Sequence, residues 1–182
     1  MVFTHDTAGA LQSAVELVNS GEPPVTIATV ADLGAFFVKH VYTGRHDGTQ
    51  AELGEVLALR PRLRELLTAD RDTAALLVND MLAEAGAVPQ LVRHPPVDWH
   101  IHAVPAEAPL ATRILVETAM AMIDVIREDE LSRLAVCADD GCAGLVLDLS
   151  RNRSRRYCST TCSNRNAQAA HRARRADQPS TA

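Results

Sequence analysis

Cys137-Ala-Asp-Asp-Gly-Cys142 and, after fifteen residues, Cys158-Ser-Thr-Thr-Cys162 hold all four cysteines of this 182-residue chain. Two short pairs separated by a loop long enough for a hairpin are the ligand pattern of a structural zinc site. No histidine lies between them, so we expect one Zn²⁺ per chain, held by the thiolates of Cys137, Cys142, Cys158 and Cys162. A closed site of this kind stabilises a fold, because hydrolysis would need an open position for water.

Two disulfides or four free thiols are the alternatives to a metal site. The chain starts Met1-Val-Phe-Thr-His-Asp6, without the basic region and long apolar run of a secretory signal peptide. The longest apolar runs fall far short of the ~20 residues that a membrane helix needs. We therefore expect a cytoplasmic protein with no membrane contact, in which the thiols are reduced and bind metal.

Charge is distributed unevenly along the chain. The net charge of −5 combines −9 in residues 1–136 with +4 from Cys137 to the end. Between Leu149 and Ala176 there is no acidic residue, and eight arginines occur there: Arg151, Arg153, Arg155, Arg156, Arg165, Arg172, Arg174 and Arg175. An acidic body with a basic tail suggests that the tail binds nucleic acid or another polyanion.

The residues before the cysteines favour helices packed through aliphatic side chains, since only 3% of the chain is aromatic. Periodic apolar positions predict a helix from Thr7 towards Gly21. Thr29 and Thr49 are each followed three residues later by an acid, which is the spacing of a capping box.

Further along the body, Pro61 can begin one helix and Asp72 can cap another. A long helix is expected from Pro109 almost to Cys137. The stretch Val97–Val104 alternates apolar and polar residues with period two, which predicts a strand. Capped helices with regular apolar spacing indicate a body with an independent core, which could also dimerise or sense a signal.

The cysteine region has its own order of elements. A knuckle at 137–142, in which Gly141 is free to take a positive φ, precedes a strand at Leu145–Leu149. Arg155–Tyr157 is expected to return as the second strand of a hairpin. Ser159 or Thr160 then caps a helix that runs to about Arg175. The predicted fold class is α+β and mainly α: an α-rich body (1–134), a small treble-clef-like four-cysteine finger with a basic helix (135–176) and a disordered tail (177–182).

The stretch from Cys137 to Arg165 resembles the CGNR zinc finger. The resemblance rests on the two cysteine pairs, an aromatic residue before the third cysteine, the final Cys-x-Asn-Arg, and a hairpin pattern formed by Asp148, Ser150, Arg151, Asn152, Arg155 and Arg156. Ser163 stands where the family has glycine. Residues 1–136, with Leu17-Val-Asn19 and Ala31-Asp-Leu33, are similar to the ABATE domain that commonly precedes this finger. The resemblance implies a bacterial stress-response transcription regulator that binds DNA through the finger.

The pattern of the last helix agrees with that implication. At 100° per residue, Asn164, Arg165, Gln168, His171, Arg172 and Arg175 fall on one face, opposite four alanines. Arginine can read guanine and amide side chains can read adenine, so this face has the composition of a major-groove helix. Phosphate contacts are expected from the hairpin residues Arg151, Arg153, Arg155 and Arg156. A zinc-stapled module that binds protein or RNA, without reading a DNA sequence, is the alternative.

Other candidate sites are weaker. His100 and His102 lie two apart on one face of the predicted strand, and a half-exposed strand explains them better than a metal site does. The chain has no Gly-rich phosphate loop and no Gly-x-Ser-x-Gly motif. We therefore expect a binding protein and not an enzyme.

Overall fold

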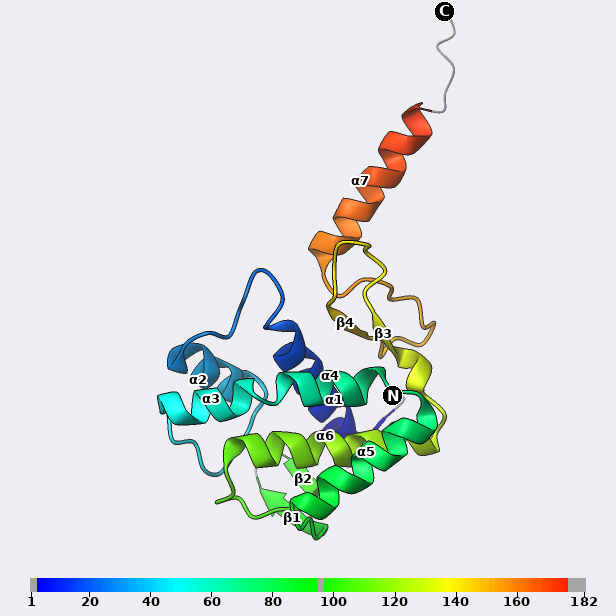
Figure 1. The fold of residues 1–182 in the computed structure, drawn as a ribbon. Helices are drawn as coiled ribbons and strands as arrows, with labels where there is room; N and C mark the ends of the chain where they lie inside the picture. Colours follow the sequence, from blue (N-terminus) through cyan, green and yellow to red (C-terminus); the bar gives the residue numbers. More distant parts are fainter. Residues whose placement is uncertain (1–2, 95–96, 177–182) are drawn as a thin grey trace, which may run out of the picture.

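The computed structural model describes residues 3–94 and 97–176 (Figure 1). The predicted tail at 177–182 lies outside these residues. The body contains α1 (His5–Asn19), α2 (Val30–Lys39), α3 (Gln50–Leu57), α4 (Arg60–Thr68), α5 (Arg71–Glu84), the strands β1 (Gln90–His94) and β2 (Val97–His102), and α6 (Leu110–Arg127). A 3₁₀ turn (Leu131–Arg133), β3 (Leu134–Val136), β4 (Leu145–Leu147) and α7 (Thr160–Ala176) follow. Over the described ranges, no helix is both long and apolar enough to cross a membrane.

Side-chain caps fix where several helices begin. The Thr29 hydroxyl accepts from the backbone N–H of Asp32, whose carboxylate accepts from the N–H of Thr29, so the predicted capping box is present. Asp70, and not the predicted Asp72, caps α5, because its carboxylate accepts from the backbone N–H groups of Asp72 and Thr73. Asp72 instead lies in the first turn of α5, where the positive end of the helix dipole stabilises its negative charge.

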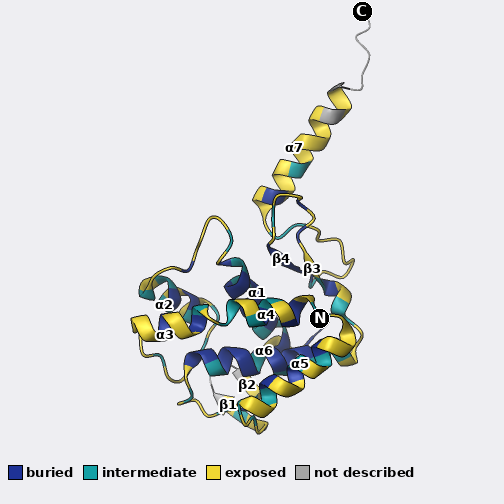
Figure 2. Ribbon diagram, viewed as in Figure 1, coloured by how far each residue is buried: buried dark blue, intermediate teal, exposed yellow. Residues whose placement is uncertain are grey.

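The body core is centred on α1 and α6, which pack against each other and against α4 and α5. α6 is buried along most of its length, and α1 buries the face that packs against it (Figure 2). The fully buried side chains are mainly aliphatic and include Leu11, Leu17, Leu66, Ile114 and Met122. Burying each such side chain contributes about 1.5–3 kcal/mol, so aliphatic packing alone supports a core of this size.

The long helix predicted to run almost to Cys137 is shorter than expected. The helix α6 ends at Arg127, and Asp129 then adopts a left-handed backbone conformation with φ of 56°. This conformation ends helices and is accessible to aspartate more readily than to most residues. The chain continues through the 3₁₀ turn into β3, so Leu134 lies in a strand.

The partner of β4 also differs from the prediction. β4 pairs antiparallel with β3, with Leu134 opposite Leu147 and Val136 opposite Leu145. The predicted second strand, Arg155–Tyr157, is not a strand. It makes one backbone bond to the knuckle, from the N–H of Ala138 to the carbonyl of Arg156. The cysteine knuckle 137–142 therefore lies at the tip of the β3–β4 hairpin, because the strand before the first cysteine pairs with β4.

β4 belongs to two cores at once. Its first and last residues, Leu145 and Leu147, are buried in the hydrophobic core of the body. The middle residue, Val146, is buried with Cys137 and Cys162 in the core of the finger. Successive strand residues point to opposite faces, so three residues suffice to join the two clusters. The finger thus lies directly on the body, beside α1 and α4 (Figure 1).

The strand predicted at 97–104 is present as β2, which ends at His102 and pairs antiparallel with β1. His100 Nδ1 lies 2.7 Å from the carbonyl oxygen of Asp98, and His100 Nε2 lies 2.9 Å from His102 Nε2. Leu91, Trp99 and Ile101 are exposed on this hairpin, which lies at the end of the molecule remote from α7 (Figure 1).

Candidate metal centre and nucleic-acid interface

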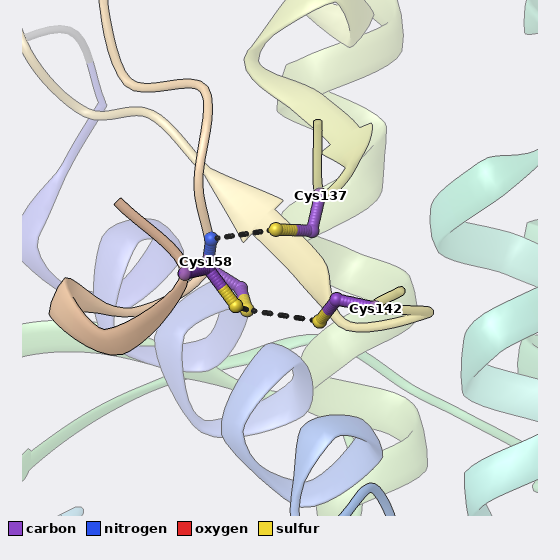
Figure 3. A group of neighbouring side chains, drawn as sticks. Cys137, Cys142 and Cys158 are labelled. Atoms are coloured by element: carbon purple, nitrogen blue, oxygen red, sulfur yellow. Dashed lines mark hydrogen bonds between the residues drawn. The ribbon is translucent and has the colours of Figure 1, made fainter. Parts of the chain in front are cut away.

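The four cysteine sulfurs converge on one point. All four lie within 4.8 Å of one another. The Sγ atoms of Cys142 and Cys158 are 3.5 Å apart (Figure 3). Those of Cys158 and Cys162 are 3.8 Å apart. Zn–S bonds of about 2.3 Å in a tetrahedron imply S···S edges of roughly 3.8 Å. The donor set and its spacing therefore fit a closed, tetrahedral, zinc-type site.

Each ligand is held by a different local structure. Cys137 follows β3, and its N–H donates to the carbonyl of Gly144 across the hairpin. Cys162 lies in the first turn of α7, where its N–H donates to the Ser159 hydroxyl, so the predicted serine cap is confirmed. Cys158 lies just before the helix.

Backbone amides point at the sulfurs, as expected for thiolate ligands. The N–H of Gly144 donates to Cys142 Sγ at 3.4 Å. The N–H of Cys158 donates to Cys137 Sγ, also at 3.4 Å (Figure 3). Burial, followed by the neighbouring thiols, raises the pKa of Cys158 well above its ordinary value. A bound cation is what makes four thiolates at this distance favourable.

Gly144, which the sequence analysis missed, is the glycine that the metal site requires. A Cβ at this position would lie 3.0 Å from Cys158 Sγ and 3.3 Å from Cys142 Sγ. Gly141, singled out from the sequence, does not adopt a positive φ; its N–H donates to Asp139 Oδ1 in a tight turn. The close approach of two cysteine sulfurs, and not the backbone conformation, therefore makes glycine necessary at position 144.

Asp139 connects the knuckle to the final helix. It is buried, and its Oδ2 accepts from Arg165 Nε at 2.7 Å and from Asn166 Nδ2 at 2.6 Å. The hydrogen bond from the Arg165 side chain is the largest cause that lowers the pKa of Asp139. A second nitrogen of Arg165 lies 3.6 Å from Cys162 Sγ. The arginine of the Cys-x-Asn-Arg motif thus braces the metal site, and Asn166 is a second brace that sequence reasoning missed.

A second buried carboxylate, Asp148, shapes the loop after β4. Its two oxygens accept from the backbone N–H groups of Ser150, at 2.8 Å, and of Arg155, at 2.6 Å. Buried Arg133 donates to the carbonyls of Asp148 and Ser150 and pairs with Glu130. These contacts explain why the loop 148–155 turns away from β4 and does not pair with it.

The hairpin arginines predicted to bind phosphate are all exposed but differ in their contacts. Arg153 pairs with Glu130 at 2.8 Å and donates to the Ser132 hydroxyl. Arg155 donates to the carbonyls of Tyr157 and Cys158. Arg156 lies over the Tyr157 ring. Within the described residues, Arg151 makes no polar side-chain contact.

α7 projects away from the body and finger (Figures 1 and 2). Its contacts to the rest of the finger come from its first two turns, through Cys162, Arg165 and Asn166. Beyond Asn166 every residue whose burial is described is exposed. All the helix residues predicted to bind nucleic acid are therefore accessible, namely Asn164, Arg165, Gln168, Arg172 and Arg175.

Comparison with protein families divides the chain into two matched parts. Residues 133–175 match the CGNR zinc finger. Residues 11–129 match the ABATE family, described as "Putative stress-induced transcription regulator". The first match covers the metal centre and α7, and the second covers the helical body. No protein of curated function matches the chain.

Proposed function

The chain belongs to the ABATE family and carries a CGNR zinc finger, and from this premise we propose that it is a bacterial, cytoplasmic transcription regulator that binds DNA through the finger in a stress response. One Zn²⁺ per chain would hold the four cysteines. The metal would have a structural role, since the four thiolates leave no open position for a substrate.

The observation that carries the proposal is the exposure of α7 together with its charge. The helix has no acidic residue, and Arg165, Arg172, Arg174 and Arg175 give it a strong positive potential. A helix that buries only its first turns derives little stability from packing against its own chain. A projecting basic helix of about 25 Å, from 17 residues at 1.5 Å each, has the dimensions to lie in a major groove.

The structure favours a division of roles among the predicted contacts. Gln168 and Arg172 lie beyond the bracing contacts and are free to read base edges. Arg165 is held by Asp139, so its main role is to fix the angle between α7 and the knuckle. The hairpin arginines, Arg151 and Arg156 above all, would contact phosphates and set the register of the helix.

Selection from a random DNA library by the zinc-loaded protein tests the proposal. Enrichment of a common sequence would support DNA reading. Binding to that sequence should weaken log-linearly with salt, and the slope should fall by about one unit in Arg151→Ala, as expected for one lost phosphate contact. The exposed Glu55→Ala change in α3, far from the finger, is the matched control and should leave the slope unchanged.

If no DNA sequence is enriched, the finger is an interaction module of another class. Salt-insensitive binding to a protein would then indicate a protein-binding module, and selective enrichment from an RNA library would indicate an RNA-binding one. Loss of metal must be excluded in each variant by elemental analysis, because an unfolded finger would lose all of these activities together.

A further inference from the structure

A cleft of about 650 Å³ lies between the body and the finger. One wall comes from α1 and the end of α2, and includes Val15, Glu16 and Lys39. The other wall comes from β4 and the loop after it, and includes Leu147, Leu149 and Arg155. The volume falls within the range of about 300–1,000 Å³ that small-molecule sites occupy.

The charges on the body wall balance one another. Glu16 Oε2 accepts from Lys39 Nζ at 2.5 Å and lies 3.1 Å from His40 Nε2. Burial is the largest cause that lowers the pKa of His40, so near neutral pH its ring is uncharged. Lys39 therefore supplies the charge that matches Glu16, and two of its three ammonium hydrogens are left for another acceptor.

The two charged groups on the finger wall, Asp148 and Arg155, do not form an ion pair with each other. Both oxygens of Asp148 accept from the backbone N–H groups of Ser150 and Arg155, which stabilise the ionised carboxylate and leave it no free oxygen turned towards a cation. The Arg155 guanidinium donates only to carbonyl oxygens, those of Tyr157 and Cys158. Within the described residues, Arg155 has no carboxylate partner. The cleft lining thus carries two carboxylates and two cations, and Arg155 is the cation with which no carboxylate pairs, beside an apolar floor.

We propose that this cleft binds a small organic acid, whose carboxylate pairs with Arg155 and Lys39 and whose apolar part lies on Val15, Leu147 and Leu149. A carboxylate matches the planar donor fork of arginine, and an apolar part matches the leucine floor. The inference rests on the proposed function for its consequence: a ligand that occupies Arg155 competes with DNA for one of the hairpin arginines. Bound acid then lowers the affinity for DNA, and DNA lowers the affinity for the acid by the same factor.

An NMR titration of the zinc-loaded full chain tests the site with two matched probes, 2-naphthoate and its uncharged amide, 2-naphthamide. We expect saturable shifts of the backbone amides of Lys39, Leu149 and Ser150 with naphthoate, and binding at least ~10-fold weaker with naphthamide, as one lost charge-assisted contact implies. Arg155→Gln and Lys39→Gln should each weaken naphthoate binding by a similar factor. Arg156→Gln, which changes a neighbouring arginine outside the cleft, should not.

Absence of saturable shifts at these amides, or equal binding of naphthoate and naphthamide, would overturn the proposal. So would unchanged naphthoate affinity in Arg155→Gln with its spectrum otherwise native. A DNA-binding assay separates this result from the proposed function. In the wild type, saturating naphthoate should weaken DNA binding. The Lys39→Gln variant should bind DNA as tightly as the wild type, but a higher naphthoate concentration should be needed to weaken that binding. If the protein binds no DNA at all, the proposed function fails, while the NMR titration still decides whether the cleft binds an acid.

Discussion

The side-chain amide of Asn19 pairs with the peptide groups of Leu145 as a neighbouring strand would. Asn19 Nδ2 donates to the Leu145 carbonyl at 2.8 Å, and the Leu145 N–H donates to Asn19 Oδ1 at 2.6 Å. The last residue of α1 thereby closes the free edge of β4, and Leu145 is buried in the body core directly beside it. The body and the finger are therefore joined by directional hydrogen bonds as well as by apolar packing.

Asn19→Ala should lower the free energy of unfolding by roughly 1–3 kcal/mol, because it leaves the N–H and carbonyl of Leu145 without partners in a part-buried position. Urea unfolding measures the loss, and hydrogen exchange should show faster exchange of the Leu145 amide. The exposed Gln12→Ala change on the same helix is the control. An unchanged exchange rate at Leu145 would show that the pairing contributes nothing.

Gly144→Ala should weaken metal binding strongly while leaving the body folded. The added Cβ would meet two ligand sulfurs at 3.0 and 3.3 Å, and neither can move without distorting the tetrahedron. Competition with a chelator measures the affinity. Gly141→Ala is the matched control, since its Cβ would meet only Asp139 Oδ1, at an ordinary 3.6 Å. Equal affinities in the two variants would contradict the role given to Gly144.

Arg165→Ala should reduce binding to every DNA sequence and speed metal loss to a chelator, because it removes the partner of buried Asp139 and a donor beside Cys162. Metal release and DNA affinity, measured on the same sample, check this prediction. Asn164→Ala, one position earlier and exposed, should leave metal release unchanged. An Arg165→Ala variant that keeps its metal and loses affinity only for a selected site would show that Arg165 reads bases.

Glu117 should make the body less stable as the pH rises. Burial raises the pKa of Glu117 to about 7, and the nearby Arg113 only partly opposes the shift. Between pH ~4.5 and ~7 the folded state therefore holds a proton that the unfolded state has released, so the free energy of unfolding falls as the pH rises through this range, by up to about 3 kcal/mol.

Glu117→Gln should remove this pH dependence and unfold at a higher temperature than the wild type at pH 8. Thermal unfolding of both proteins at pH 5, 6, 7 and 8 provides the comparison, with the finger kept loaded with metal. Parallel curves for the two proteins would mean that Glu117 titrates alike in the folded and unfolded states.

Local sequence rules predicted the parts of this molecule that local interactions determine. The cysteine spacing predicted that the four thiols cluster, because each pair needs only one turn of backbone to converge. The capping box at Thr29 was predictable because its two hydrogen bonds span three residues. In both cases a short stretch of chain contains every group that takes part.

Long-range pairings were not predictable in this way. The pattern of Leu131 and Leu134 fits a helix as well as a 3₁₀ turn followed by a strand, and only the pairing of β3 with β4 decides between them. The pair Asp139–Arg165 joins residues far apart in sequence, and Asp139 resembled an ordinary turn residue beside Asp140. The pattern of apolar residues alone cannot show that β4 packs against the body core on one face and against the finger core on the other.

The effect of Gln168→Ala on binding to two DNA duplexes shows whether α7 reads a DNA sequence. Gln168 is exposed, lies beyond the bracing contacts and carries no charge, so its removal leaves phosphate electrostatics and the metal site intact. We expect that the variant keeps its metal, loses ~1–3 kcal/mol of affinity for the selected site and binds random DNA as the wild type does. Equal affinity changes on both duplexes, or none on either, with the metal retained, would contradict the claim that this helix reads sequence.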